Sequence, residues 1–165
     1  MFPADIDALS VKILDAAKLR GLMVVTAESC TGGLVAGALT AVAGSSAVVD
    51  RGFVTYTNAA KTRMLGVPAE LIEAHGAVSE PVARAMASGA LAASDAAVSV
   101  AVTGIAGPGG GSPDKPVGLV HFAADGALGP VHVERRFGDI GREAVRLDSV
   151  RQALGLILRQ LEGRP

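Results

Sequence analysis

Cysteine and aromatic residues are scarce in this sequence. Among its 165 residues Cys30 is the single cysteine, and Phe, Trp and Tyr together make up 3%. A lone cysteine excludes a disulfide within the chain and is typical of a reducing compartment, so we expect a cytoplasmic protein. Few aromatic rings leave few surfaces on which bases or sugars could stack. Alanine and valine provide much of the 50% hydrophobic content, which predicts close packing of small side chains.

An excess of charge of one sign and a long hydrophobic run are also missing. The formal net charge is -1, and no stretch is rich in Lys or Arg. General nucleic-acid binding needs a basic surface, so we expect no nucleic-acid partner. One arginine and a few backbone N–H groups could still hold a small phosphate ester. Segment 1–21 does not have the pattern of a signal peptide, and no apolar run reaches the roughly 18 residues of a membrane span, so no membrane partner is expected.

Hydrophobic periodicity predicts that helices and strands alternate. Residues 4–20 have helical spacing, and the β-branched run 22–26 is typical of a strand buried on both faces. Further helices are expected at 34–42, 61–65, 69–74, 79–93 and 141–161, and further strands at 47–57, 96–102, 117–124 and 130–137. Asn58 and Ser79 are expected N-caps, and Asp125-Gly126 indicates a hairpin. These elements predict a single three-layer α/β/α domain over residues 1–165, with a mixed, mostly parallel sheet and one antiparallel hairpin.

Ser29 is a candidate nucleophile because it follows the first buried strand and precedes a helix. The crevice beyond the carboxyl ends of the strands binds ligands in open α/β sheets. Unpaired N–H groups at the start of the helix could hold an oxyanion or a phosphate, and Gly32 and Gly33 let a substrate approach the backbone closely. A helix cap at Ser29 or Thr31 is the alternative explanation of the same segment. The G-x-S-x-G signature of α/β-hydrolases is absent.

A serine nucleophile needs a base, and the histidines supply no defensible Ser-His-Asp order. His121 and His132 could face each other across the hairpin, but no third ligand accompanies them, so no metal site is expected. Lys61 is the alternative base, since serine–lysine pairs are known. Its pKa would have to fall from about 10.4 to about 7.5 through desolvation or a nearby positive charge, for which Arg51, Arg63 and Arg142 are candidates. A solvated lysine on a helix remains the alternative.

Two other segments invite a catalytic or ligand-binding interpretation. Ser112 and Lys115 have the S-x-x-K spacing of penicillin-binding enzymes, but Pro116 disfavours a helix at Lys115 and three glycines precede the pair. We therefore reject this pair as catalytic and keep Lys115 as a candidate ligand contact. The glycine-rich stretch 104–111 could cradle a phosphate, although it lacks the Gly-Lys-Ser/Thr ending of a P-loop, and a flexible crossover explains it equally well.

Several unusual blocks occur in one order along the chain. They are AESCTGG at 27–33, GSS at 44–46, VTYTNAAK at 54–61, LGV at 65–67, HGAVSE at 75–80, VARAMASGA at 82–90, TGIAGPGGG at 103–111 and KPVG at 115–118. Together they resemble the C-terminal domain of CinA proteins, the nicotinamide-nucleotide amidase (PncC) family, over about residues 9–161. The resemblance implies an α/β/α fold and hydrolysis of nicotinamide mononucleotide to nicotinate mononucleotide and ammonia, without a metal or cofactor.

The resemblance also implies roles for individual residues. Ser29 matches the family's nucleophile and Lys61 its base. Polar positions that line the pocket are matched by Tyr56 and Thr103, and Arg142 looks like a phosphate ligand. Backbone contacts with the substrate are expected from Gly32, Gly33 and Gly104.

Departures from the family pattern are small. Ala43 stands where a proline is common, and Arg51-Gly52 stands where Gly-Gly is frequent; neither touches the expected serine–lysine dyad. Many relatives carry an additional N-terminal domain, whose activity is not carried over. A non-catalytic nucleotide-binding module and a partner protein in competence or DNA repair remain alternatives. The alanine-rich helical surface favours self-association, so a homo-oligomer is expected.

Overall fold

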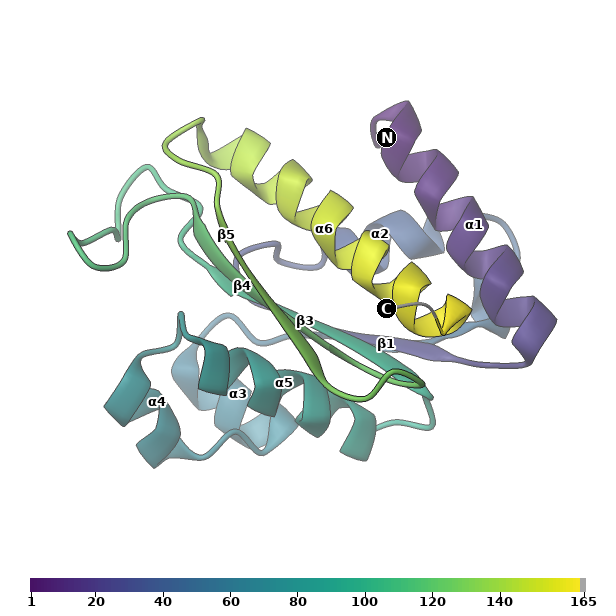
Figure 1. Ribbon diagram of the computed structural model, residues 1–165, viewed down its shortest axis with the longest axis horizontal. Coiled ribbons are helices and arrows are strands. Elements are labelled where there is room, and N and C mark those ends of the chain that lie inside the picture. Colours follow the sequence, from purple (N-terminus) through teal and green to yellow (C-terminus); the bar gives the residue numbers. More distant parts are fainter. Residues whose placement is uncertain (164–165) are drawn as a thin grey trace.

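The computed structural model describes residues 1–163 and is built around one five-stranded sheet (Figure 1). The strands, in the order β2-β1-β3-β4-β5, are β2 (Val49–Val54), β1 (Val24–Glu28), β3 (Val98–Gly104), β4 (Leu119–Asp125) and β5 (Val131–Arg136). β1 pairs in parallel with both β2 and β3, whereas β4 is antiparallel to β3 and β5. Only β4 therefore runs against the others, which confirms the predicted mixed sheet and its hairpin.

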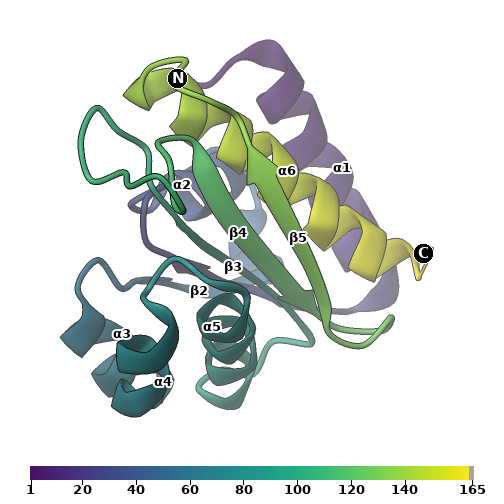
Figure 2. The same cartoon turned by 60° about the vertical axis from the view of Figure 1, so that its left-hand side comes forward.

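Helices cover both faces of the sheet. On one face lie α1 (Ala4–Arg20), α2 (Leu34–Thr40) and α6 (Arg142–Glu162), and on the other lie α3 (Asn58–Leu65), α4 (Ala69–His75) and α5 (Glu80–Ala92) (Figures 1 and 2). A short 3-10 turn, Ser45–Ala47, precedes β2. The three layers expected from the sequence are confirmed. Within residues 1–163, none of the helices has the length and apolarity needed to cross a bilayer.

The two cores explain why β1 is buried along its whole length and β3 is buried up to its last residue. Their side chains alternate between the layers: Val24 and Val100 pack in the core under α1 and α6, and Val25 and Ala101 pack in the core under α5. Such strands, buried on both faces, are a feature of sheets covered by helices on each side. The sequence prediction of a doubly buried first strand is confirmed, although the strand begins and ends two residues later than expected, at Val24–Glu28.

Several element ends differ from the prediction for local reasons. Thr57, rather than Asn58, is the N-cap of α3, because its side chain accepts a hydrogen bond from the Ala60 N–H at 3.1 Å. Ser79 does stand at the N-cap position of α5, but its hydroxyl donates to the Gly76 carbonyl at 2.8 Å and caps nothing. The hairpin forms as expected, with a connection that runs over residues 126–130 between β4 and β5.

The fold brings three loop segments to the same edge of the sheet. β1, β2 and β3 are parallel neighbours, so their carboxyl ends lie side by side. β1 is followed by the turn 29–33, β2 by the segment 55–57 that enters α3, and β3 by the glycine-rich loop 105–118. This edge is where the predicted site residues gather.

Candidate active site

Ser29 and Lys61 meet at this edge. Ser29 is the first residue after β1, and Lys61 lies in the first turn of α3, whose start the Thr57 cap fixes. Lys61 Nζ lies 2.9 Å from Ser29 Oγ and donates a hydrogen bond to the Thr55 carbonyl oxygen at 2.8 Å. The Lys61 side chain is only 1% exposed. It is therefore a buried amine in contact with the serine hydroxyl, and the alternative of a solvated lysine on a helix surface is wrong.

Burial sets the electrostatics of Lys61. Desolvation lowers the pKa of Lys61 below its ordinary value of 10.5, with the neighbouring Cys30 acting weakly in the other direction. No carboxylate of residues 1–163 forms an ion pair with the amine. Of the two causes considered from the sequence, desolvation is the one that lowers the pKa of Lys61, and no positive charge from Arg51, Arg63 or Arg142 contributes.

Cys30 sits beside the pair without competing with it. Burial raises the pKa of the Cys30 thiol to about 12, and Glu28 adds to that increase. A thiol with so high a pKa stays protonated near neutral pH, and it is the thiolate that is nucleophilic. Of the two adjacent side chains, Ser29 is therefore the one with an activating base.

The turn that carries Ser29 is held by the buried Glu28. Its carboxylate accepts hydrogen bonds from the N–H groups of Gly33, Val35 and Ala36 at 3.0, 3.0 and 2.8 Å. A carboxylate in this position satisfies the free donors at the start of α2 and interacts favourably with the helix dipole. The side chain of Glu28, rather than that of Ser29 or Thr31, therefore caps the start of α2.

This capping changes the role of the two glycines. The Gly33 N–H is bound by Glu28, and the Gly32 N–H donates to the Ser29 carbonyl at 3.0 Å. Neither glycine lines the adjacent cavity. Their φ values of 60° and 96° show instead that they shape the turn, in a region that favours glycine. The N–H groups of Cys30 and Thr31 have no acceptor among residues 1–163, which makes them the free donors next to Ser29.

A cavity of about 280 Å³ opens beside Ser29 and Lys61. Apart from Gly32 and Gly33, the site residues predicted from the sequence all line this cavity: Ser29, Lys61, Tyr56, Thr103, Gly104 and Arg142. Lys61 and Thr103, each 1% exposed, form its buried end beside the half-buried Ser29, whereas Tyr56 is 58% exposed. The cavity therefore runs from a buried amine and a half-buried serine to an open mouth that Arg142 lines.

The polar groups of the cavity are tied to the surrounding loops. Arg142 donates to Tyr56 Oη and to the Gly107 carbonyl, both at 2.9 Å, and so connects α6 with the segments after β2 and β3. The Thr103 hydroxyl donates to the Ala77 carbonyl at 2.8 Å. Arg142 keeps guanidinium donors near the mouth, where they could meet an anion.

Two further candidates from the sequence lie elsewhere. Lys115 donates to the His75 carbonyl at 2.6 Å and does not line the cavity. His121 and His132 do face each other across the hairpin, with Nδ1 and Nε2 3.0 Å apart. Among residues 1–163, no cluster of three or more His, Cys, Asp or Glu side chains could hold a metal ion.

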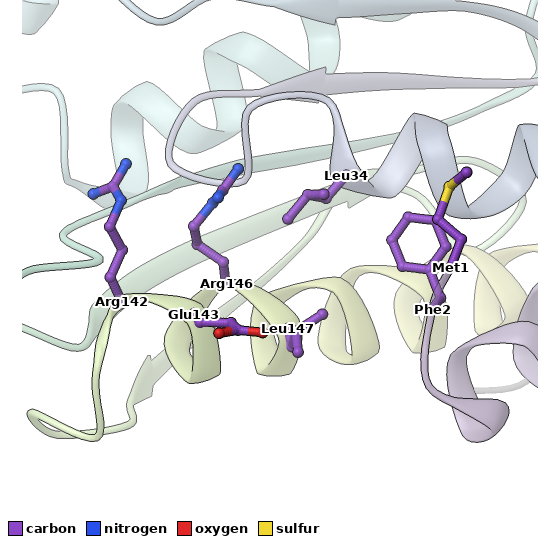
Figure 3. A pocket seen from close by; sticks show the side chains of 7 residues that line it. All are labelled: Met1, Phe2, Leu34, Arg142, Glu143, Arg146 and Leu147. Carbon is purple, nitrogen blue, oxygen red and sulfur yellow. The ribbon is translucent and has the colours of Figure 1, made fainter.

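Arg146 is the contact that sequence reasoning missed. It lies one turn after Arg142 on α6, and its guanidinium donates to the carbonyl oxygens of Cys30 and Thr31 at 3.1 and 3.0 Å. The only sequence signal for it was the i, i+4 spacing from Arg142, which places both side chains on one side of the helix. Figure 3 shows the two arginines extending in the same direction, with Arg146 ending against the turn before α2.

A second, larger cavity adjoins the first and shares Arg142 with it. It has a volume of about 550 Å³ and is lined by Met1, Phe2, Leu34, Arg142, Glu143, Arg146 and Leu147 (Figure 3). It contains neither Ser29 nor Lys61, so the smaller cavity is the candidate active site. Arg146 lines the larger cavity but not the smaller one.

The fold and the site together define a class: a three-layer α/β/α protein in which a serine contacts a buried lysine at the carboxyl edge of the parallel strands. Residues 6–161 match the family model described as the CinA C-terminal domain. The chain therefore belongs to the CinA C-terminal domain family, as the resemblance of its sequence blocks predicted.

Individual relatives agree with this assignment. A CinA-like protein of Anaeromyxobacter dehalogenans is 59% identical over 139 residues, which are 84% of this chain and 34% of that protein. The chain thus spans about a third of the length of that relative. The nicotinamide-nucleotide amidohydrolase PncC of Enterobacter agglomerans is 53% identical over 92% of this chain and 93% of its own length. The crystal structure of the competence/damage inducible protein CihA from Agrobacterium tumefaciens superposes with a TM-score of 0.95, at 59% identity, over 98% of both chains.

Proposed function

We propose that the protein is an amidohydrolase that converts nicotinamide mononucleotide to nicotinate mononucleotide and ammonia, with Ser29 as nucleophile and Lys61 as base. One observation carries the proposal: the hydroxyl of Ser29 lies 2.9 Å from a buried amine whose pKa is lowered by desolvation. The name of the Enterobacter relative, a nicotinamide-nucleotide amidohydrolase that matches this chain nearly end to end, supports the choice of substrate.

In the proposed reaction, the neutral Lys61 amine takes the Ser29 proton as Oγ attacks the carboxamide carbon. The protonated lysine then gives that proton to the departing nitrogen, which leaves as ammonia. Water attacks the resulting ester with Lys61 again as base, and this step releases the carboxylate and restores the serine hydroxyl. The positive charge of the pyridinium ring makes the carboxamide carbon more electrophilic, which favours the nucleotide over simple amides.

The oxyanion formed at each step needs hydrogen-bond donors. The N–H of the residue after a serine nucleophile has this role in α/β-hydrolases, and here that residue is Cys30. Cys30 lines the cavity, and its N–H and that of Thr31 are free, whereas those of Gly32 and Gly33 are already bound. We therefore assign the oxyanion to the Cys30 and Thr31 N–H groups in place of the two glycines.

The phosphate would bind at the mouth of the cavity. Arg142 lines that mouth and already points its guanidinium toward Tyr56 and the glycine-rich loop. The cavity volume of about 280 Å³ lies just below the usual range of ligand pockets, about 300 to 1,000 Å³, which favours a ligand no larger than a mononucleotide. Binding energy from the phosphate would help to orient the reacting carbon against Ser29.

The decisive experiment is the release of ammonia from nicotinamide mononucleotide by the purified protein. Turnover by the parent should fall by about 10³-fold in Ser29→Ala and in Lys61→Ala, while Lys12→Ala, which changes an exposed lysine of α1, keeps full activity. A folded parent that binds the nucleotide without releasing ammonia would contradict the proposal and indicate a non-catalytic nucleotide-binding module.

The phosphate anchor has its own test. Nicotinamide riboside, which lacks the phosphate, should be turned over much more slowly than the nucleotide. Arg142→Met should raise KM for the nucleotide and leave the riboside reaction nearly unchanged. Comparable turnover of both substrates by the parent would contradict a phosphate contact at Arg142.

The proposal also covers the cellular location and the oligomeric state of the protein. We place the protein in the cytoplasm, on the evidence of its single cysteine, and expect a homo-oligomer. Static light scattering of the purified chain tests the second point: a mass of one chain at enzyme-assay concentration would contradict it.

A further inference from the structure

The side chain of Arg146 fastens the turn that carries the nucleophile. Its Nε and Nη2 atoms donate to the carbonyl oxygens of Cys30 and Thr31 at 3.1 and 3.0 Å. The fit is close: a Cβ atom added to Gly32 would lie 3.3 Å from Nη2. A planar guanidinium with several donors can hold two neighbouring carbonyls at once, which a lysine cannot do with the same geometry.

These two hydrogen bonds fix the direction of the adjacent N–H groups. In a trans peptide the C=O and the following N–H lie in one plane and point in opposite directions. Holding the Cys30 carbonyl therefore directs the Thr31 N–H away from Arg146. Holding the Thr31 carbonyl does the same for the Gly32 N–H, which donates to the Ser29 carbonyl at 3.0 Å.

Two side chains of opposite charge, Glu28 and Arg146, thus hold the turn between β1 and α2, one through its N–H groups and the other through its carbonyls. Glu28 binds the N–H groups of Gly33, Val35 and Ala36, and Arg146 binds the carbonyls of Cys30 and Thr31. The N–H groups of Cys30 and Thr31 are left without an acceptor among residues 1–163. A guanidinium on the carbonyl oxygen also polarises the peptide, which strengthens its N–H as a donor.

We propose that Arg146 is a positioning residue, which orients and polarises the Cys30–Thr31 peptide so that its free Thr31 N–H, together with the neighbouring Cys30 N–H, stabilises the oxyanion formed at Ser29. The inference rests on the proposed amidohydrolase activity. It separates the roles of the two arginines on α6: Arg142 binds substrate at the mouth, and Arg146 acts through the backbone of the turn.

The test is a comparison of kcat and KM. Arg146→Met should lower kcat by about 10²-fold, the effect of losing one oxyanion donor, with KM and the affinity for the product nicotinate mononucleotide nearly unchanged. Arg146→Lys, which keeps the charge but can hold only one carbonyl, should fall between the parent and Arg146→Met. Arg142→Met should show the opposite pattern, a raised KM. Arg159→Met, which changes an exposed arginine near the end of the same helix, is the matched control and should match the parent.

Rescue separates positioning from general stability. The cavity of about 550 Å³ beside Arg146 can admit a guanidinium ion, so millimolar guanidinium should restore part of the kcat of Arg146→Ala without changing its melting temperature. A kcat of Arg146→Met within twofold of the parent would overturn the proposal. So would a loss of kcat that tracks a loss of product binding in both Arg146→Met and Arg146→Lys.

A second measurement, the labelling rate of Ser29, tests the role of Arg146 without relying on the proposed substrate. A fluorophosphonate labels an activated serine through a transition state whose developing oxyanion needs the same donors, and it requires no amide substrate. Labelling of Ser29 should be slower in Arg146→Met than in the parent and unchanged in Arg159→Met. A parent that labels at Ser29 but releases no ammonia would refute the proposed substrate, whereas equal labelling rates in parent and Arg146→Met would refute the role of Arg146.

Discussion

The hydrogen-bond partners of Lys61 suit a neutral amine. Its Nζ has two partners among residues 1–163, the Thr55 carbonyl at 2.8 Å and the Ser29 hydroxyl at 2.9 Å. A neutral amine can donate to Thr55 and accept the Ser29 O–H with its lone pair. This is the arrangement that proton removal from the serine requires.

The rate should therefore depend on pH through Lys61. Because desolvation lowers the pKa of Lys61, kcat/KM should rise with pH and level off with a midpoint below the ordinary lysine value of 10.5. Lys61→Arg should lose about 10³-fold in kcat, since arginine is not deprotonated in proteins. Initial rates of ammonia release across the pH range measure both effects.

A control separates the loss of the base from the loss of the fold. Lys61→Met keeps an unbranched side chain in the same buried space, so it should be folded and inactive. Retention of activity in Lys61→Arg, or a midpoint at or above 10.5, would contradict Lys61 as the base.

Side chains of the site could be predicted from the sequence, whereas its backbone groups could not. The motif blocks contain Ser29, Tyr56, Lys61 and Thr103, and the resemblance adds Arg142 at the start of the last helix. All five line one cavity. The carbonyl of Thr55 and the free N–H of Cys30 have no residue type to mark them, because every residue has these groups. Their direction depends on how Glu28 and Arg146 hold the turn, which is a property of the fold.

The position of helix α3 depends on a single glycine of helix α5. A Cβ atom added to Gly89 would overlap the carbonyl oxygen of Leu65, the last residue of α3. Helix α5 therefore packs directly against the carboxyl end of α3. Since α3 carries Lys61, this contact helps to set how far the amine reaches toward Ser29.

Substitution of Gly89 should therefore affect both stability and activity. Gly89→Ala should lower the free energy of unfolding by about 1–3 kcal/mol, as overpacking typically does, and should also reduce kcat as α3 is displaced. Urea denaturation and ammonia release measure the two effects. Gly155→Ala on α6 is the matched control: the added Cβ meets nothing within 4 Å, so it should stabilise the protein by about 0.4–1 kcal/mol without changing kcat. Equal stability of Gly89→Ala and the parent would contradict this packing.

The existence of each element was more predictable than its ends. Burial patterns, together with Gly, Pro and capping residues, located the α-helices and strands but missed the short 3-10 turn Ser45–Ala47. Their ends depend on competition between neighbouring polar groups. Thr57 and Asn58 are both good caps, and the structure uses Thr57. The Ser79 hydroxyl is drawn to the Gly76 carbonyl, a loop contact that local sequence does not reveal.

At the scale of the whole molecule, two histidines connect the hairpin with the helical layer below it. His121 on β4 and His132 on β5 stack with ring centroids 5.2 Å apart, and His132 Nδ1 lies 3.5 Å from Glu80 at the start of α5. Burial lowers the pKa of both histidines below 6.5, and repulsion from His132 lowers that of His121 further. Glu80 and Glu134 oppose the decrease, while Lys115 adds to it at His121 and Arg84 adds to it at His132.

These pKa values predict that the protein loses stability as the solution becomes acidic. A histidine with a lowered pKa binds fewer protons in the folded state than in the unfolded chain, so the free energy of unfolding rises with pH across this range. The contribution should be fully present above 6.5 and be lost as the pH falls from there toward the lower values of the folded state. Urea denaturation at several pH values on both sides of 6.5 measures the slope.

Two variants assign this slope to the histidine pair. His132→Gln keeps a hydrogen-bonding side chain next to His121 but removes one titrating group and its repulsion, so the slope below 6.5 should become shallower. His75→Gln, at an exposed position on α4, should leave the slope as in the parent. A slope that is the same in His132→Gln and the parent would assign the acid sensitivity to other groups. A shallower one would show that the pair lets pH act on the contact between the hairpin and α5, at a distance from Ser29 and Lys61.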